Sequence, residues 1–453
     1  MRNSPSNLAV IVLAAGSGTR MKSRRAKVLH EMCGRSMLAH VLTTAEALEP
    51  ERLIVVVGEG AEEVEETFVG RCEFVLQAEQ KGTGHAVLQA EPKLSDFEGD
   101  VLVLYADVPL LRPETLRAML ADKEHGEADL LILTAEAETI PGRILRDAVG
   151  RVTRVVEKQD ATRAEMAILE RNTGVYLLGA QLLRSCLAKI DDSNAQGELY
   201  LTDVVGLAVA SGKRVSAMQL EDANECLGIN TREELADAVA VLRSRINSHW
   251  MDEGVTLVDP ASTYIDTDVR IGRDSVIEPG CQILGDTVVG EGCHIKAYTV
   301  IESSRIGDDV SVGPSSHLRA DTQLDRGVKI GNFVEVKNAV LGAGTKAAHL
   351  TYIGDATVGE RVNFGCGSVV VNYDGFAKHR TSVGDDVFIG CNVNLIAPVT
   401  VRNHSYVAAG STINLEVPEQ ALAVARAKQR NIDGWVARRE ARAGKAKEEQ
   451  EQK

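Results

Sequence analysis

An apolar residue, nearly always aliphatic, recurs at almost every sixth position between Ile271 and Ile413, and a glycine often follows it. A helix repeats every 3.6 residues and a flat strand every 2, so neither predicts a period of six. A chain wound around a triangular prism does, because each face takes one hexad with one aliphatic side chain pointing to the axis. The pattern predicts a left-handed parallel β-helix of hexapeptide repeats. The repeating positions are Ile271, Ile277, Ile283, Val289, Ile295, Ile301, Ile306, Val312, Leu318, Leu324, Ile330, Val336, Leu341, Ile353, Val358, Phe364, Val370, Val383, Ile389, Leu395, Val401, Val407 and Ile413.

The rhythm is interrupted at four places. One residue is missing after Ile301, after Val336 and after Ile353, and the spacing from Val370 to Val383 is thirteen. Residues 371–380 carry little of the aliphatic pattern. They predict a loop that leaves the prism, and such loops often carry function.

Residues 8–220 follow a different pattern, in which short continuous apolar runs alternate with helical periodicity. Such runs are typical of buried strands in a mainly parallel sheet covered by helices on both faces, so we expect a Rossmann-like α/β domain. Ligands of these sheets bind beyond the carboxyl ends of the strands. The expected strands include Leu8–Ala15, Leu53–Val57, Phe74–Gln77, Val101–Tyr105 and Asp129–Thr134.

A single helix is expected to connect the two patterns. Thr231 and Glu234 have the spacing of a capping box, and the apolar positions of Thr231–Trp250 form one stripe. We therefore expect residues 1–231 to form the first domain, residues 232–252 a helical linker, and residues 253–453 the β-helix domain with a charged tail.

Composition and charge narrow the function classes. The chain has 453 residues, of which 44% are apolar and 25% charged, as in ordinary soluble proteins. Its net charge of -15 argues against nucleic acid as a general partner. None of the eight cysteines forms a CxxC pair, so we expect reduced thiols. There is no signal-peptide pattern and no apolar stretch of membrane-spanning length, so we expect a cytoplasmic protein without a membrane partner.

The first apolar run ends in a glycine-rich loop, Leu13–Met21. Gly16 and Gly18 would let backbone N–H groups approach phosphates, and Arg20 and Lys27 would neutralise their charge. Met21 replaces the third glycine of a dinucleotide-binding fingerprint, and no Walker ending follows. By itself the loop could therefore be a structural turn.

Together with Lys27, the loop resembles the signature of sugar-nucleotide pyrophosphorylases. Segment 77–86 resembles their uridine-binding segment, and Glu157 with 172–174 resembles their sugar-binding positions. Segments 104–110 and 228–230 agree with the same family. This resemblance implies that UTP or the UDP-sugar contacts Leu13, Ala14, Ala15, Gly16, Lys27, Gln77, Gly82, Thr83, Tyr105, Ala106, Asp107, Gly142, Glu157, Asn172 and Asn230.

A magnesium site is expected at the end of the fourth strand. Asp107 follows a buried strand, and Asn230 closes the domain. Mg2+ prefers oxygen ligands and keeps waters and substrate phosphates, so two protein ligands suffice. Alone, Asp107 could equally be a helix cap or an ion-pair partner.

The second half also contains candidate chemistry. His349 and Tyr352 lie within one coil, and Glu335, fourteen residues before His349, could hold the imidazole ring. Arg319 and Lys337 are eighteen residues apart, so they should stack on adjacent coils and need an anion between them. A lone histidine is more often structural, so the hypothesis of a functional site rests on the residues around His349.

The motifs H-L-T-Y-x-G-D (349–355) and N-Y-D-G (372–375) extend the resemblance to nearly the whole chain. The chain resembles the bacterial bifunctional N-acetylglucosamine-1-phosphate uridylyltransferase/glucosamine-1-phosphate acetyltransferase family. That resemblance implies UTP and acetyl-CoA as substrates, Mg2+ as cofactor, and a homotrimer whose acetyl-transfer site forms between subunits. Its product is UDP-N-acetylglucosamine, a precursor for cell-wall and lipopolysaccharide synthesis.

The same resemblance implies residue roles. His349 would be the base of acetyl transfer, assisted by Glu335, while Arg20 and Lys27 would act in uridylyl transfer. The sugar phosphate of the acetyl-transfer site would contact Arg319, Lys337, Tyr352 and Asn363. Acetyl-CoA would contact Cys366, Asn372, Tyr373, Cys391, Ala409 and Arg426.

Four positions depart from the usual family pattern. Ala106 stands where glycine commonly precedes the metal-binding aspartate, and Pro141 where tyrosine is usual. Cys391 replaces a common serine and Cys366 a common alanine. These changes bear on rates more than on the type of reaction.

Three interpretations compete. The chain is a bifunctional enzyme, or a pyrophosphorylase whose β-helix only assembles and regulates it, or a nucleotide-sensing scaffold without activity. His349, the Asn372–Tyr373 loop and Arg426 argue against the second, and Arg20, Lys27, Asp107 and Asn230 argue against the third.

Overall fold

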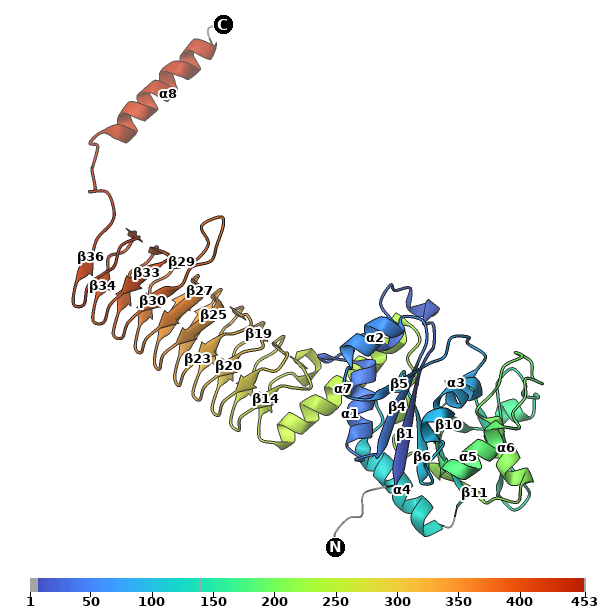
Figure 1. Ribbon diagram of the computed structural model, residues 1–453. Helices are drawn as coiled ribbons and strands as arrows, with labels where there is room; N and C mark the ends of the chain where they lie inside the picture. Colours follow the sequence, from blue (N-terminus) through green and yellow to red (C-terminus); the bar gives the residue numbers. More distant parts are fainter. Residues whose placement is uncertain (1–6, 127, 138–139, 452–453) are drawn as a thin grey trace. The chain divides into compact units, whose positions relative to one another are not determined.

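The computed structural model describes residues 7–126, 128–137 and 140–451 (Figure 1). The chain divides into two compact units. Unit 1 comprises Met1–Glu253 with Tyr264–Val269, and unit 2 comprises Gly254–Thr263 with Arg270–Lys453. Our finer three-part division, with residues 232–252 as a separate linker, stays a prediction.

Unit 1 is built on a mixed sheet with the strand order β11-β7-β10-β6-β1-β4-β5. β6, β1, β4 and β5 run parallel, as expected, whereas β10 is antiparallel to both of its neighbours. An apolar run does not encode strand direction, so the reversal had no signal in the sequence. The strands of unit 1, inside and outside this sheet, are β1 (Leu8–Ala14), β2 (Glu31–Met32), β3 (Arg35–Ser36), β4 (Arg52–Val57), β5 (Glu73–Leu76), β6 (Asp100–Tyr105), β7 (Leu130–Glu136), β8 (Arg143–Arg146), β9 (Val152–Val156), β10 (Glu170–Gly179), β11 (Val215–Gln219) and β13 (Tyr264–Ile265).

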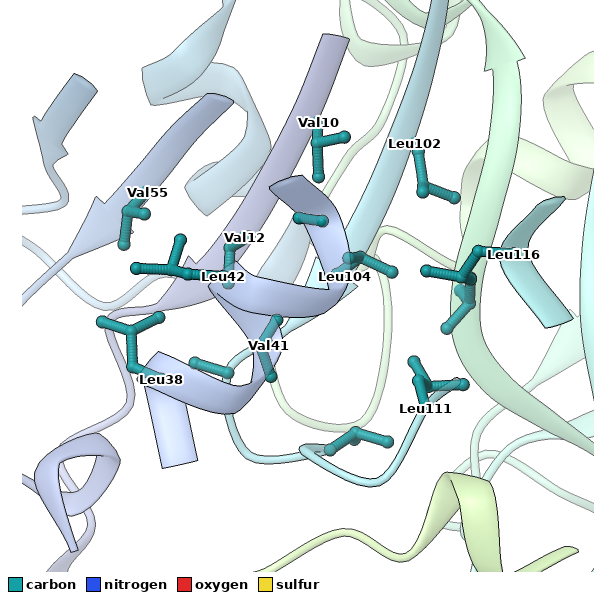
Figure 2. Packing of buried hydrophobic residues seen from close by; sticks show 14 of the residues in the cluster. Val10, Val12, Leu38, Val41, Leu42, Val55, Leu102, Leu104, Leu111 and Leu116 are labelled. Atoms are coloured by element: carbon teal, nitrogen blue, oxygen red, sulfur yellow. The ribbon is translucent and has the colours of Figure 1, made fainter. Parts of the chain in front are cut away.

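Helices cover both faces of this sheet, which explains its continuous apolar runs. Val10 and Val12 of β1 face one core with α1 and α4, while Ile11 and Leu13 face the other with α3, α5 and α6. Figure 2 shows the first core, where Leu38, Val41 and Leu42 of α1 meet the strands. Each fully buried aliphatic side chain of this kind contributes ~1.5–3 kcal/mol. The helices are α1 (Met37–Glu46), α2 (Ala61–Thr67), α3 (Thr83–Ala90), α4 (Pro113–Gly126), α5 (Ala180–Leu187) and α6 (Asp203–Ala210).

The expected long helix is α7 (Arg232–Asp252). Its capping box is present: the Glu234 N–H donates to Thr231 Oγ1, and the Glu234 carboxylate accepts from the Thr231 N–H. The apolar stripe packs against a small cluster in unit 1 that includes Met37 and Ile229. Both predictions for this helix are therefore confirmed.

Unit 2 is a parallel β-helix with three faces, as the six-residue rhythm predicted. The apolar repeat positions are buried on its axis, and equivalent residues of successive coils pair in register, as Ile277, Ile295 and Val312 do. Coils are eighteen residues long where the rhythm is regular and seventeen where it skips.

The strands of unit 2 are short and fall on three faces. The first face holds β12 (Thr256–Leu257), β15 (Val276–Ile277), β18 (His294–Ile295), β21 (Ser311–Val312), β24 (Lys329–Asn332), β26 (Lys346–His349), β28 (Asn363–Phe364), β31 (Phe388–Ile389), β34 (Tyr406–Val407) and β36 (Leu422–Ala423). The second holds β16 (Gln282–Leu284), β19 (Val300–Glu302), β22 (His317–Leu318), β29 (Val369–Val371), β32 (Asn394–Ile396) and β35 (Thr412–Ile413). The third holds β14 (Arg270–Ile271), β17 (Val288–Val289), β20 (Arg305–Ile306), β23 (Gln323–Leu324), β30 (Thr381–Val383) and β33 (Val399–Val401), and the longer β25 (Glu335–Leu341) and β27 (Tyr352–Val358) join the second and third faces.

Hydrogen bonds from buried hydroxyl groups join successive coils. The apolar rhythm did not predict these bonds. Ser275 Oγ donates to the Gly290 carbonyl at 2.9 Å, and Thr345 Oγ1 donates to the Gly359 carbonyl at 2.8 Å. Because an unpaired buried backbone carbonyl is costly, these bonds stabilise the turns between faces.

Two segments leave the β-helix. The predicted loop is present between β29 and β30, where the Asp374 carboxylate accepts from the backbone N–H groups of Ala377 and Phe376 (Figure 1). These bonds, together with the contact to His379, lower the pKa of Asp374. The charged tail forms α8 (Trp435–Glu451), as predicted. Among the described residues, no helix has the length and apolar character of a membrane span.

Candidate active sites

A cavity of about 380 Å³ lies at the carboxyl ends of β1 and β6. It gathers eleven of the expected nucleotide-site residues: Leu13, Ala15, Gly16, Arg20, Lys27, Gln77, Gly82, Thr83, Tyr105, Asp107 and Asn230. Ala14 lines a smaller neighbouring cavity. Ala106, Gly142, Glu157 and Asn172 do not line the main cavity.

The glycine-rich loop is shaped by one close approach. Gly18 has a φ of 60°, and a Cβ there would lie 2.5 Å from Lys27 Cβ. Only glycine fits this position without displacing Lys27. Met21, at the place of the missing third glycine, is buried in the core and ends a short 3-10 helix. The loop is thus held by packing on one side and remains open to the cavity on the other.

Lys27 brings the two expected metal ligands together. Its ammonium donates to Asp107 Oδ2 at 2.6 Å and to Asn230 Oδ1 at 2.8 Å, and Lys27 is only 8% exposed. Two hard oxygen donors therefore converge on one point, the Lys27 ammonium, beside the glycine-rich loop. That donor set fits Mg2+, which takes few protein ligands when phosphates supply others. No group of three or more His, Cys, Asp or Glu suited to a metal occurs in the described part of the chain.

The opposite end of the cavity holds an oriented amide. Gln77 is 4% exposed, and its Nε2 donates to the Gly82 carbonyl at 3.1 Å and contacts His85 Nδ1 at 3.0 Å. Because the Gly82 carbonyl accepts from Nε2, the Gln77 carbonyl oxygen is the acceptor that this amide can offer to a ligand's N–H. His85 was not expected from the sequence, although it stands within the same motif.

The residues expected to bind the sugar lie around Tyr105. A Cβ on Gly174 would lie 2.6 Å from Tyr105 Cε2, and one on Gly142 would lie 3.1 Å from Asn172 Cβ. Burial raises the pKa of Glu157, and burial together with the charge of Glu157 raises the pKa of Tyr105. The cavity is also lined by Gly18, as expected of the glycine-rich loop, and by Ser17, Thr19, Gln80, Ala86 and Glu198, which we did not single out as contacts. Gln80 lies within a motif already recognised, whereas Glu198 lies on a connection that has no sequence signal.

In unit 2, a cavity of about 350 Å³ is lined by three cationic side chains and by the carboxylates of Glu302, Asp321 and Asp355. Arg319 and Lys337 both line it, on neighbouring coils as expected, and Lys378 joins them from the protruding loop. The close approach of Lys378 lowers the pKa of Lys337. These three cations, for which we call it the cationic cavity, are donors that suit an anion such as a phosphate. Lys378 was missed because residue spacing cannot place a loop.

Asp355 lies at the wall of this cavity. Burial alone would raise its pKa, but hydrogen bonds from Asn338 and Asn372 and the nearby lysines outweigh that effect and lower it. Asn372, expected at acetyl-CoA, is buried, with its amide against Asp355 and 3.4 Å from the Tyr352 hydroxyl. It therefore ties the loop to the β-helix within the single chain.

His349 is held by Asn332 rather than by Glu335. His349 Nδ1 and Asn332 Oδ1 are 2.7 Å apart, so Nδ1 carries the proton and Nε2 can accept one. Glu335 instead accepts from Arg319 at 3.1 Å. The expectation that Glu335 contacts the ring thus needs correction: the coil here is seventeen residues long, which puts Asn332 in register with His349. His349, Tyr352 and Asn363 do not line the cationic cavity.

Three of the expected acetyl-CoA residues form a column. The Asn392 N–H donates to the Cys366 carbonyl and the Gly410 N–H to the Cys391 carbonyl, both at 2.8 Å, so Cys366, Cys391 and Ala409 occupy the same corner of successive coils. Tyr373 is 57% exposed on the loop, and Arg426 is exposed beyond β36.

Known proteins match both halves of the chain. The MobA-like NTP transferase domain family matches residues 10–196, and the bacterial transferase hexapeptide (six repeats) family matches residues 268–303 and 380–414. Proteins described as bifunctional protein GlmU from an Exiguobacterium species and from Brevibacillus brevis are 48% and 47% identical to this chain. The alignments cover 94% of this chain and 99% and 96% of those relatives. A crystal structure of UDP-glucose pyrophosphorylase complexed with UDP-glucose aligns at 19% identity with a TM-score of 0.44, over 52% of this chain and 98% of that one.

Proposed function

The chain belongs to the family of bifunctional GlmU proteins, and from this membership we infer how its two sites divide the chemistry. It is a bifunctional transferase. It transfers an acetyl group from acetyl-CoA to glucosamine 1-phosphate and a uridylyl group from UTP to N-acetylglucosamine 1-phosphate, with release of pyrophosphate. The observation that supports this division is that each unit carries its own cavity, lined by two or more cationic side chains that can bind a phosphate.

Uridylyl transfer takes place in unit 1. The glycine-rich loop and Arg20 bind the triphosphate, and the Gln77 carbonyl oxygen accepts the N3–H of uracil. Asp107 and Asn230 would hold Mg2+, which neutralises phosphate charge when bound. Lys27 then turns from these two residues to the phosphates. An oxygen of the sugar phosphate attacks the α-phosphorus in line, and the bond to pyrophosphate breaks.

Acetyl transfer takes place in unit 2. Arg319, Lys337 and Lys378 bind the phosphate of glucosamine 1-phosphate. His349 Nε2 takes a proton from the sugar amine, because Asn332 holds the proton on Nδ1. The amine attacks the thioester carbonyl, the carbon–sulfur bond breaks, and coenzyme A leaves as a thiolate that takes up a proton.

One assay tests the whole proposal. Purified full-length protein is incubated with glucosamine 1-phosphate, acetyl-CoA, UTP and Mg2+, and the products are identified by mass. We expect UDP-N-acetylglucosamine, and omission of Mg2+ should stop the reaction at N-acetylglucosamine 1-phosphate. A chain that makes the nucleotide sugar only from supplied N-acetylglucosamine 1-phosphate would be a pyrophosphorylase with a structural β-helix.

We propose a cytoplasmic homotrimer as the working form. The column of Cys366, Cys391 and Ala409 lies open at a corner of one chain, and Arg426 lies on an exposed extension beyond the last coil. A neighbouring subunit's extension would complete the acetyl-CoA site. Light scattering should give about three times the chain mass of 48.7 kDa. A monomer with full acetyl transfer would contradict the shared site.

Replacement of Lys378 should weaken binding of the sugar phosphate. Lys378→Ala removes one of three cations around the cavity, so KM for glucosamine 1-phosphate should rise about tenfold, the size of one charge-assisted hydrogen bond. KM for UTP should not change. Lys346→Ala is the matched control, because Lys346 is exposed on the β-helix outside this cavity. Equal KM values for both variants would remove Lys378 from the site.

A further inference from the structure

Two thiols are stacked at one corner of the β-helix. Cys366 and Cys391 occupy equivalent positions of adjacent coils, since Phe364 pairs with Ile389 and the Asn392 N–H donates to the Cys366 carbonyl at 2.8 Å. Backbones of neighbouring strands lie ~4.8 Å apart. That spacing lies within the range of about 4.4–6.8 Å between the Cα atoms of bonded cysteines. The backbone spacing at this pair is therefore compatible with a disulfide bond.

The remaining six cysteines are chemically different. Burial raises the pKa of Cys33, Cys72, Cys226 and Cys281 to about 11, and it also raises the pKa of Cys186 and Cys293. Because the thiolate is the reactive form, these six thiols are poor nucleophiles. Cys391 is exposed and Cys366 is partly exposed. Reactivity towards disulfides should therefore concentrate on this pair.

We propose that Cys391 and Cys366 form a modification site for disulfides of coenzyme A, and that its oxidation reversibly blocks acetyl transfer. The choice of coenzyme A rests on the proposed function, which places the acetyl-CoA site at the same column. Cys391 is the attacking thiol, because it is the more exposed. Cys366 is the resolving thiol, because it lies in register one coil away.

The chemistry is two successive thiol–disulfide exchanges. The Cys391 thiolate attacks one sulfur of coenzyme A disulfide, forming a mixed disulfide and releasing one coenzyme A thiolate. The Cys366 thiolate then attacks the Cys391 sulfur, forming the Cys366–Cys391 disulfide and releasing the second coenzyme A thiolate. Each released thiolate takes up a proton, and two reduced thiols on the protein have become one disulfide. A thiol reductant reverses both steps.

Three variants of the full-length protein test this proposal. Reduced wild type, Cys366→Ala, Cys391→Ser and the control Cys72→Ala are incubated with coenzyme A disulfide, and intact mass and both activities are measured. We expect wild type and the control to lose the mass of two hydrogen atoms. Cys366→Ala should retain one bound coenzyme A, because no resolving thiol is present, and Cys391→Ser should gain nothing. Acetyl transfer by wild type should fall at least tenfold relative to its own reduced activity and return with dithiothreitol, while uridylyl transfer stays unchanged.

Other results separate the thiol chemistry from the proposed function. An unchanged wild-type mass, or equal modification of Cys391→Ser, would overturn the thiol pair. Equal rates with glutathione disulfide would overturn the assignment to coenzyme A. Formation of the disulfide in a protein whose reduced form lacks acetyl transfer would support the thiol pair and contradict the proposed function instead.

Discussion

Replacement of His349 by alanine should abolish acetyl transfer and leave uridylyl transfer intact. Coenzyme A release from acetyl-CoA and glucosamine 1-phosphate should fall by about 10²- to 10⁴-fold, the usual contribution of a positioned general base. The reason is geometric: Asn332 keeps the proton on Nδ1, so Nε2 is the group that can accept one from the amine. Pyrophosphate release from UTP and N-acetylglucosamine 1-phosphate reports on the other unit and should stay at the wild-type rate.

The β-helix offers a matched histidine. His294 also lies on a strand of the first face, β18, and contacts a carboxylate, Glu278, at 2.7 Å, but this strand is three coils away from β26, which carries His349. His294→Ala should therefore retain acetyl transfer. Wild-type acetyl transfer by His349→Ala, in a protein with the oligomeric state of the wild type, would remove His349 as the base. Asn332→Ala should lower kcat and leave KM for the sugar phosphate nearly unchanged, because it affects the orientation of the ring and not the anion site.

Most of the fold could be predicted because it follows from the local periodicity of apolar residues in the sequence. The six-residue rhythm predicted the β-helix and the places where one residue is skipped, and the capping box of α7 predicted the start of that helix. The antiparallel direction of β10 could not be predicted, since an apolar strand has the same pattern in either direction.

The residues of the two candidate sites can also be divided into those that the sequence could predict and those that it could not. Lys27, Asp107 and Asn230 lie far apart in sequence. Only the resemblance to a known family predicted that they belong to one site, and in the structure they are hydrogen-bonded to one another through Lys27. Asn332 could have been found from the sequence alone, by counting one shortened coil back from His349 instead of choosing the nearest carboxylate. Lys378 could not, because it reaches the cationic cavity from a loop whose path no repeat describes.

Replacement of Asp107 should have the opposite effect to replacement of His349. Asp107→Ala removes one of the two oxygen donors that converge beside the phosphate-binding loop, so Mg2+-dependent uridylyl transfer should fall by about 10²- to 10³-fold, as for the loss of one preorganised electrostatic contact. The concentration of Mg2+ that gives half-maximal activity should rise. Acetyl transfer should not change, because its residues belong to unit 2.

The control for this variant lies on the same strand. Asp100 begins β6 and pairs with Lys123 at 2.8 Å, whereas Asp107 follows the other end of that strand. Asp100→Asn should keep its response to Mg2+, which separates the role of the carboxylate at the cavity from any effect on the strand. Asp107→Asn keeps the size of the side chain and removes its charge, so its Mg2+ response should also be weaker. If instead Asp107→Ala showed the wild-type Mg2+ dependence, Asp107 would serve only as the partner of Lys27, and the metal would be held by the substrate phosphates.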